Sequence, residues 1–275
     1  MIRKAVGLFN SVFPNMQWKI SQRWFEHIST IDSGTAMLFM NYGYADLDPQ
    51  AEKPMLAAHD ESNRYCIQLY HHVAAAIDLA GLDVIEIGCG RGGGADYIHR
   101  YLKPNRTVAI DLAANAIDFC TQQYDMPGLS FQRGNAEELD FADATFDAVV
   151  SIESSVCFQN VEKFFAEVIR ILKPGGFFLY ADLRDSEKIE TWKSHLAQMN
   201  LDKLSQKNIT PNVLRALDLD NDRKQLLIKR YAPRILHKIF NEFAGMQKTR
   251  FFYGAFQNGE KVYRSYIFRK PMRAD

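Results

Sequence analysis

The sequence has few cysteines and no closely spaced pair of them. The four cysteines lie far apart and form no Cys-x-x-Cys motif: Cys66, Cys89, Cys120 and Cys157. This spacing argues against a zinc site and against the disulfide framework of a small secreted protein. No other cluster of metal-ligating residues is evident, so we expect no bound metal.

Long apolar runs and a signal sequence are also lacking. No run approaches the roughly 18 residues that a membrane-spanning helix needs. Arg3 and Lys4 lie near the start, but Pro14, Asn15 and Gln17 interrupt the residues that follow, so we expect no signal peptide. Together with the cysteine pattern, these absences predict a cytoplasmic protein without integral membrane association.

An excess of charge of one sign is absent as well. The 33 basic residues equal the 33 acidic ones, which gives a formal net charge of zero. A dedicated nucleic-acid binder usually has a basic excess, so nucleic acid is not an expected partner. Apolar residues, by contrast, are plentiful: 47% of the 275 residues are hydrophobic, enough for a core in one large domain or two small ones.

Short apolar runs alternate with helical segments in the middle of the chain. A helix is predicted over 61–80, ended by Gly81. Five strands are predicted beyond it, at 83–88, 107–111, 129–134, 147–152 and 176–181. Helices are predicted between them, at 93–102, 113–124 and 160–172. This alternation is typical of an α/β doubly wound fold, a parallel sheet covered by helices on both faces.

The flanks of this core have other patterns. Residues 1–30 have amphipathic helical periodicity and 186–245 are helical in character, whereas TRFFYGAFQ and EKVYRSYIF, joined by Asn258-Gly259, predict a terminal antiparallel hairpin. The predicted units are an N-terminal helical lid and loop (1–60), an α/β core (61–182), a helical cap (183–246) and the hairpin (247–275). We expect the cap and the N-terminal helix to form a mobile cover over an apolar pocket.

A glycine-rich turn follows the first predicted strand. Glu86, Gly88, Gly90 and Gly92 form an acidic-x-Gly-x-Gly-x-Gly pattern. Glycines at such a turn let a ligand approach bare backbone. Gly88, Gly90 and Gly93 also satisfy the dinucleotide pattern GxGxxG, which is a weak signal alone. Glu86, however, is suited to a positively charged amino group and would repel a pyrophosphate.

Polar residues follow the second and third predicted strands. Asp111 lies about 20 residues beyond Gly90, where a carboxylate can accept both hydroxyls of a ribose. It could also cap the helix that begins at Ala113. Asn135 can hydrogen-bond an adenine amino group, with a backbone donor at Ala136, although Asn after Gly also suits a plain turn.

Five motifs occur in order along the core: EIGCGRGGG, AIDLAANAI, RGNAEELDF, FDAVVSIES and LKPGGFFLYAD. They resemble the successive motifs of class I S-adenosylmethionine-dependent methyltransferases. The resemblance implies a Rossmann-like, mostly parallel seven-stranded sheet and S-adenosyl-L-methionine as cofactor. It implies cofactor contacts from residues of these motifs, namely Glu86, Gly88, Cys89, Gly90, Asp111, Leu112, Asn135, Ala136 and Ser151.

The flanking segments carry a closer resemblance. FMNYGYADLDP, DESNRYCIQLYHH and LYADLR resemble the phthiotriol/phenolphthiotriol dimycocerosate methyltransferases and related natural-product O-methyltransferases. This implies O-methylation of a hydroxyl on a polyketide-type, lipid-like or other secondary-metabolite acceptor. NYGY resembles the aromatic-Gly segment that closes over the cofactor in many small-molecule methyltransferases, which implies a cofactor contact from Tyr42.

A general base is harder to assign. Related sequences have His residues just after the fourth strand, whereas Val156 and Asn160 stand in that region here. We rank His71 first, because the similar family has Leu-Tyr-His at that place, and Glu153 second, ahead of Asp182. A metal-independent mechanism is expected. Methylation at nitrogen or carbon, an NAD(P)-dependent oxidoreductase and a non-catalytic cofactor-binding protein remain alternatives.

Overall fold

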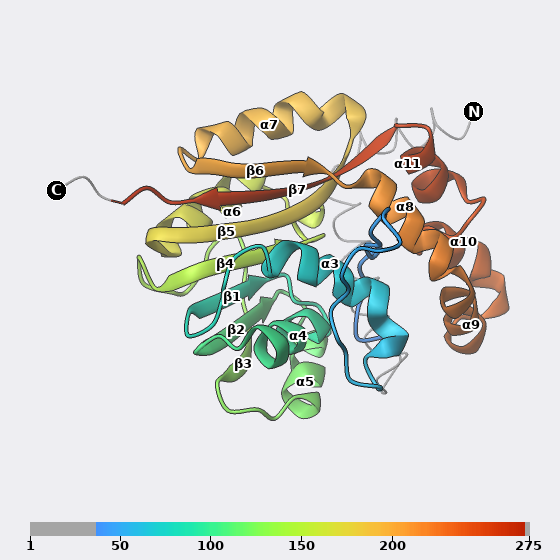
Figure 1. Ribbon diagram of the computed structural model, residues 1–275, viewed down its shortest axis with the longest axis horizontal. Helices are drawn as coiled ribbons and strands as arrows, with labels where there is room; N and C mark the ends of the chain where they lie inside the picture. Colours follow the sequence, from blue (N-terminus) through green and yellow to red (C-terminus); the bar gives the residue numbers. More distant parts are fainter. Residues whose placement is uncertain (1–36, 273–275) are drawn as a thin grey trace.

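The computed structural model describes residues 37–272, which contain one seven-stranded sheet (Figure 1). The strands lie in the order β3-β2-β1-β4-β5-β7-β6. Their bounds are β1 (Asp83–Ile87), β2 (Arg106–Asp111), β3 (Leu129–Arg133), β4 (Phe146–Ile152), β5 (Leu172–Asp185), β6 (Asp202–Asn208) and β7 (Lys261–Arg269). Strands β1 to β5 are parallel, and β7 runs antiparallel between β5 and β6. The predicted doubly wound, mostly parallel sheet is confirmed.

Helices cover both faces of this sheet, because its central strands are apolar on both sides. Val84 and Val150 pack in one core with residues of α3 and α4, whereas Ile85 and Val149 pack in a second core with residues of α6 and α7. Consecutive strand residues thus face opposite helical layers. The helices of these layers are α3 (Arg64–Ala74), α4 (Gly93–Leu102), α5 (Ala114–Gln123), α6 (Val161–Ile171) and α7 (Ile189–Gln198). A short 3₁₀ turn, η1 (Glu61–Asn63), precedes α3, which ends well before Gly81.

The antiparallel end of the sheet is built differently from the prediction. β7 coincides with the predicted run EKVYRSYIF, but it pairs with β5 and with β6, and β6 comes from within the segment predicted as helical. The run TRFFYGAFQ is a π-helical turn, η5 (Arg250–Gly254), followed by α11 (Ala255–Gln257). The predicted hairpin connection is therefore wrong, and the predicted cap contains a strand.

Both errors have a physical cause. β6 is an edge strand in which Lys203 and Lys207 are exposed, so it shows no apolar alternation that could reveal it. The aromatic residues before β7 have a different use, because Phe252 and Phe256 pack against the ring of Tyr42, at centroid distances of 5.4 and 5.7 Å. Tertiary packing thus overrides their strand propensity.

The cap lies at the carboxyl ends of the parallel strands (Figure 1). It consists of α8 (Thr210–Leu219), α9 (Asn221–Tyr231), η4 (Arg234–Leu236), α10 (His237–Phe243), η5 and α11. The hydroxyl of Tyr42 donates to the carbonyl of Phe243 at 3.1 Å and so joins the segment before α3 to the cap. The predicted N-terminal helix at 1–30 lies outside the described residues.

A buried polar network holds the short 3₁₀ turn after β4, η2 (Ser155–Cys157), against β5. Asp182 is fully buried and accepts from the Ser155 hydroxyl at 2.6 Å and the Val156 amide at 3.0 Å. Arg184 forms an ion pair with Asp182 at 3.2 Å and also donates to Ser155 at 2.7 Å. Tyr180 bonds Ser155 at 2.5 Å and accepts from the indole of Trp192. Every member of the network has a partner.

We expect Arg184→Met to lower the free energy of unfolding by about 3 kcal/mol, because it leaves a buried carboxylate without its cation. Urea denaturation would measure the change. Asp182→Asn combined with Arg184→Met should recover part of the loss, since neither charge is then present. A loss below about 1 kcal/mol would show that hydrogen bonds alone satisfy Asp182.

Candidate active site

The glycine-rich turn connects β1 to α4 at the point where the strand order reverses. Gly88, Gly90 and Gly92 have φ angles of 82°, 53° and 77°, a region that favours glycine. A Cβ on Gly88 would lie 2.4 Å from the Cβ of Ser154. The Ser154 hydroxyl donates to the carbonyl of Ile87 at 3.1 Å and bonds the Ser151 hydroxyl at 2.6 Å. These contacts bring the ends of β1 and β4 together.

Glu86 lies directly beneath this turn and is 1% exposed. Its Oε1 accepts from the Tyr70 hydroxyl at 2.6 Å, whereas its Oε2 is buried and has no hydrogen-bond partner within residues 37–272. Burial raises the pKa of Glu86 to about 7, and the hydrogen bond from Tyr70, together with the nearby Ala95 amide, only partly offsets this. An unpaired buried carboxylate oxygen is costly, so this position fits a cationic group such as an ammonium.

Asp111 joins the end of β2 to the same turn. Its Oδ2 accepts from the Gly90 amide at 2.8 Å and its Oδ1 from the Ala113 amide at 2.9 Å. Asp111 can therefore bond the Ala113 amide at the start of α5 and also accept from a ribose, because each carboxylate oxygen retains a second lone pair for a ribose hydroxyl. Burial raises the pKa of Asp111, while these amides act in the opposite direction.

The other predicted cofactor residues lie around this edge in different ways. Asn135 is exposed and its side chain accepts from the Glu137 amide at 3.1 Å, so it shapes a turn, while Ala136 is buried. The carbonyl of Leu112 accepts from the guanidinium of Arg133. Cys89 is buried within the turn and Ser151 is fully buried, bonded to Ser154. Cofactor contacts from these residues stay predictions.

Glu153 follows β4 directly and has a φ of 52°, unusual for a glutamate. Its amide donates to Ala181 of β5 at 2.9 Å, and its Oε1 accepts from the Tyr42 amide at 2.8 Å and the Tyr263 hydroxyl at 3.0 Å. Among the described residues, none donates a hydrogen bond to Oε2. Burial raises the pKa of Glu153 to about 8, although the hydrogen bonds from Tyr42 and Tyr263 and the ammonium of Lys224 act to lower it.

His71 has a different environment. Its Nδ1 is hydrogen-bonded to the Tyr97 hydroxyl at 2.7 Å, and burial lowers its pKa. Neighbouring side chains on a helix project about 100° apart, and it is Tyr70 that reaches Glu86. Within residues 37–272, no hydrogen bond joins His71 to Glu86 or to Glu153. The structure therefore does not bring the first-ranked base to the turn.

Sequence reasoning missed three residues of this site. Tyr70 bonds Glu86, Tyr263 bonds Glu153, and the Lys224 ammonium lies 3.5 Å from the carbonyl of Tyr42. Tyr70 stands in the Leu-Tyr-His triplet of the segment DESNRYCIQLYHH, but the prediction assigned that signal to His71. Tyr263 and Lys224 come from the far end of the chain, and no motif marks them.

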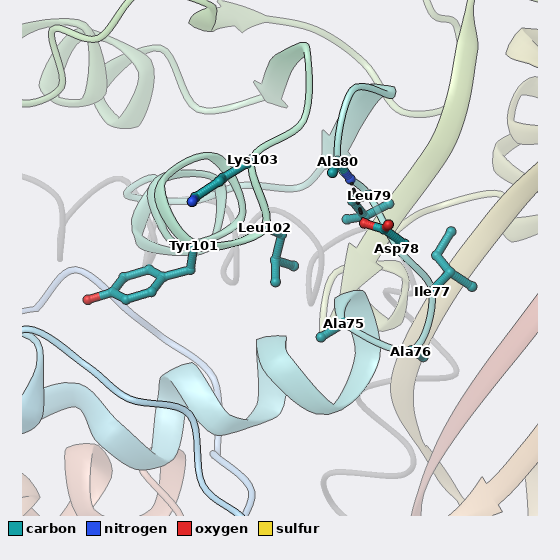
Figure 2. A pocket seen from close by; sticks show the side chains of 9 residues that line it. All are labelled: Ala75, Ala76, Ile77, Asp78, Leu79, Ala80, Tyr101, Leu102 and Lys103. Atoms are coloured by element: carbon teal, nitrogen blue, oxygen red, sulfur yellow. Dashed lines mark hydrogen bonds between the residues drawn. The ribbon is translucent and has the colours of Figure 1, made fainter.

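A cavity in the described part of the chain lies away from the glycine-rich turn, and no metal site is found among residues 37–272. A cavity of about 530 Å³ lies at the ends of α3 and α4, lined by residues 75–80 and 101–103 (Figure 2). Its one carboxylate, Asp78, accepts from the Ala80 amide. These loops lead into the amino ends of β1 and β2, away from Glu86. Among residues 37–272, no three His, Cys, Asp or Glu side chains cluster to hold a metal, and no helix is long and apolar enough to cross a membrane.

Comparison with known proteins identifies the family. A methyltransferase-domain family model matches residues 85–180. A phthiotriol/phenolphthiotriol dimycocerosates methyltransferase of Mycobacterium tuberculosis is 41% identical over 234 residues, 85% of this chain and 86% of that protein. The chain belongs to this methyltransferase family. A fatty-acid O-methyltransferase of Mycolicibacterium smegmatis is 39% identical over 86% of this chain and 84% of its own length.

Solved structures agree on the fold. The cyclopropane synthase MmaA2 of Mycobacterium tuberculosis aligns with a TM-score of 0.65 at 17% identity, over 86% of this chain and 93% of that one. The protein is an S-adenosylmethionine-dependent methyltransferase with the class I fold, and the NAD(P)-dependent oxidoreductase alternative is set aside. The site fits this cofactor, because Glu86 Oε2 is a buried acceptor without a partner and the turn presents bare backbone.

The pKa of Glu86 gives a pH test. Ionised Glu86 attracts the ammonium of the ligand, so the affinity for S-adenosylhomocysteine should increase as the pH rises through about 7. Glu86→Gln should bind more weakly and lose this part of the pH dependence. Isothermal titration calorimetry over this pH range measures the affinity and its pH dependence. The control is Glu190→Gln, which changes an exposed carboxylate that pairs with Lys193. The same pH dependence in Glu86→Gln as in the wild type would contradict the assignment.

Asp111→Asn should weaken S-adenosylhomocysteine binding by roughly 10- to 150-fold, because charge-assisted hydrogen bonds contribute about 1.5 to 3 kcal/mol. Asparagine retains one acceptor oxygen for the Gly90 or Ala113 amide, so the thermal unfolding temperature should change less than in Asp111→Ala. An unchanged dissociation constant in both variants would remove Asp111 from the binding site.

Proposed function

We propose that the enzyme transfers the methyl group of S-adenosylmethionine to a hydroxyl oxygen of a lipid-like, polyketide-type acceptor, with Glu153 as the general base. The geometry of Glu153 carries the proposal. Its Oε1 is occupied by two donors, and its Oε2 receives no hydrogen bond from the described residues. The relatives' names, which specify dimycocerosates and fatty acids, support an acceptor of this class.

The chain's task is positioning and proton transfer. The cofactor supplies an electrophilic methyl group on a sulfonium. Glu86 and Asp111 would hold the amino-acid and ribose parts of the ligand, so that the methyl faces the edge near Glu153. An aliphatic hydroxyl is a poor nucleophile, so loss of its proton to Glu153 Oε2 during attack would lower the barrier.

Asp182 is a weaker candidate although it lies on the neighbouring strand. Its two oxygens accept from Ser155, from the Val156 amide and from the Leu183 amide, and Arg184 pairs with it. A carboxylate held by four partners is a poor base, because taking a proton would break a charge-assisted pair. The pKa of Glu153, raised to about 8, lies near the value that favours proton transfer close to neutral pH.

The surroundings of Glu153 suit an apolar acceptor. Tyr42, Phe252 and Phe256 form a connected aromatic group, and Tyr263 lies 6.5 Å from Phe256, centroid to centroid. Aromatic rings at this edge would exclude water and pack along an aliphatic chain. The fatty-acid relative favours one second candidate, methylation of a carboxylate oxygen, which requires no base because the acceptor is already ionised.

Glu153→Gln separates these cases. Glutamine retains an acceptor for Tyr42 and Tyr263 but cannot take a proton, so turnover on a hydroxyl acceptor should fall by about 10²- to 10⁴-fold with S-adenosylhomocysteine affinity little changed. Wild-type turnover should increase as the pH rises through about 8, where Glu153 ionises. Long-chain alcohols and the matching fatty acids serve as acceptors.

Two further variants complete the measurement. His71→Ala should lose less than about tenfold, and the exposed carboxylate variant Glu190→Gln should keep wild-type turnover. A large loss in His71→Ala without one in Glu153→Gln would reverse the assignment. Turnover on fatty acids alone, unaffected by Glu153→Gln, would favour carboxylate methylation by positioning without a base.

A further inference from the structure

The cap carries an excess of positive charge that the whole chain lacks. Between residues 221 and 250 there are eight lysines and arginines and two acidic residues, a net charge of +6 in a chain whose formal net charge is zero. Six of the cations are exposed: Lys229, Arg230, Arg234, Lys238, Lys248 and Arg250. Among residues 37–272, no carboxylate forms an ion pair with any of these six. Their charge is therefore available to an anionic partner.

Large apolar side chains are exposed among these cations. Leu226 of α9 is 66% exposed, Ile235 of η4 88%, Ile239 of α10 46% and Phe251 of η5 50%. Ile235 and Ile239 are four residues apart, so they project from the same side of the helical segment. Moving these side chains from water into an apolar environment would be favourable. The other residues of the described chain leave them exposed to the fractions given above.

The elements that carry these residues lie side by side. α10 contacts α9, η4 and η5, and the carboxylate of Glu242 accepts from the amides of Arg250 and Phe251 at 3.0 and 2.9 Å. In Figure 1 they form the end of the molecule beyond the carboxyl ends of the strands. We call the four apolar and six basic residues the cap surface. The elements that carry it lie at the carboxyl ends of the parallel strands, and Glu153 directly follows one of these ends, that of β4.

We propose that the cap surface docks on the surface of an anionic lipid bilayer. A bilayer offers both partners that the surface needs, since anionic headgroups attract the cations and the acyl boundary accepts the apolar side chains. A nucleic acid would match the positive charge but would offer no apolar surface to bury Ile235 and Ile239. Docking would place the carboxyl edge near the source of a lipid-like acceptor. The inference concerns binding alone and does not depend on which atom is methylated.

Vesicle sedimentation of the full chain tests the proposal. The probes are vesicles of phosphatidylcholine alone and vesicles in which about a third of the lipid is phosphatidylglycerol. The wild type should bind the anionic vesicles and release them as salt increases. Each basic residue contributes about fivefold near such a surface, so Arg234→Gln with Lys238→Gln should lose about 25-fold in partition coefficient at low salt.

A second pair of substitutions separates charge from apolar contact. Ile235→Ser with Ile239→Ser should weaken binding at low and high salt alike, because salt does not screen apolar burial. The matched control, Lys203→Gln with Leu204→Ser, removes one cation and one exposed leucine from β6 and should bind as the wild type does. Unchanged circular dichroism and S-adenosylhomocysteine affinity would show that the variants fold.

Several results would overturn the proposal. They are absence of binding to the anionic vesicles, equal loss in the β6 control, and binding that survives both pairs of cap substitutions. Salt-sensitive binding to duplex DNA without vesicle binding would assign the surface to nucleic acid instead. A dimer that both pairs of substitutions disrupt, again without vesicle binding, would assign it to a second copy of the chain.

Discussion

Glu153 is the residue at which separate parts of the chain meet. Its backbone is held by Ala181 of β5, and its side chain holds the Tyr42 amide and the Tyr263 hydroxyl. A left-handed backbone at such a residue costs about 1 to 3 kcal/mol and persists only where its surroundings require it. The surroundings of Glu153 are the contacts of its carboxyl group, which joins the end of β4 to β7 and to the segment before α3. The aromatic contacts of Tyr42 then extend this junction to the cap.

Carboxyl side chains whose pKa is raised by burial dominate the electrostatics at the edge where the parallel strands end. Burial raises the pKa of Glu86, Asp111 and Glu153, and the charge of Asp111 raises that of Glu86 further. A carboxyl whose pKa is raised by folding favours the folded state at low pH, and this contribution is lost as the pH rises through about 7 and 8 for Glu86 and Glu153. A ligand that carries an ammonium and a sulfonium would offset the cost of ionising these carboxyls, and binding would then be linked to stability.

The cap has two chemically different sides. Phe252 and Phe256 face Tyr42 at the junction with the core, whereas Arg234 and Lys238 are exposed. Lys224 is the exception, because it is a cation of the same segment that is buried near Glu153, and burial lowers its pKa. Different elements of the cap thus supply the two sides: η5 and α11 supply the aromatic rings, and η4 and α10 supply these exposed cations.

The core and the glycine-rich turn could be predicted from the sequence because their signals are local. Strand and helix alternate within a few residues, and the turn requires glycine wherever φ is positive, as at Gly88 and Gly90. Asp111 could be placed at the same edge because the carboxyl ends of parallel strands coincide. β6 could not be recognised, since an edge strand with exposed lysines has no apolar period.

Only the tertiary structure decided where the side chains of the candidate bases His71 and Glu153 lie. His71 and Tyr70 are neighbours in the chain, but the helix directs Tyr70 to Glu86 and His71 to Tyr97. The free oxygen of Glu153 depends on donors from distant residues, Tyr42 and Tyr263, which no short-range pattern connects. The sequence by itself determined the fold class and the cofactor edge, because periodicity and turn chemistry act over a few residues. The surroundings of Glu153 depend on long-range packing, and only the folded chain brings those residues together.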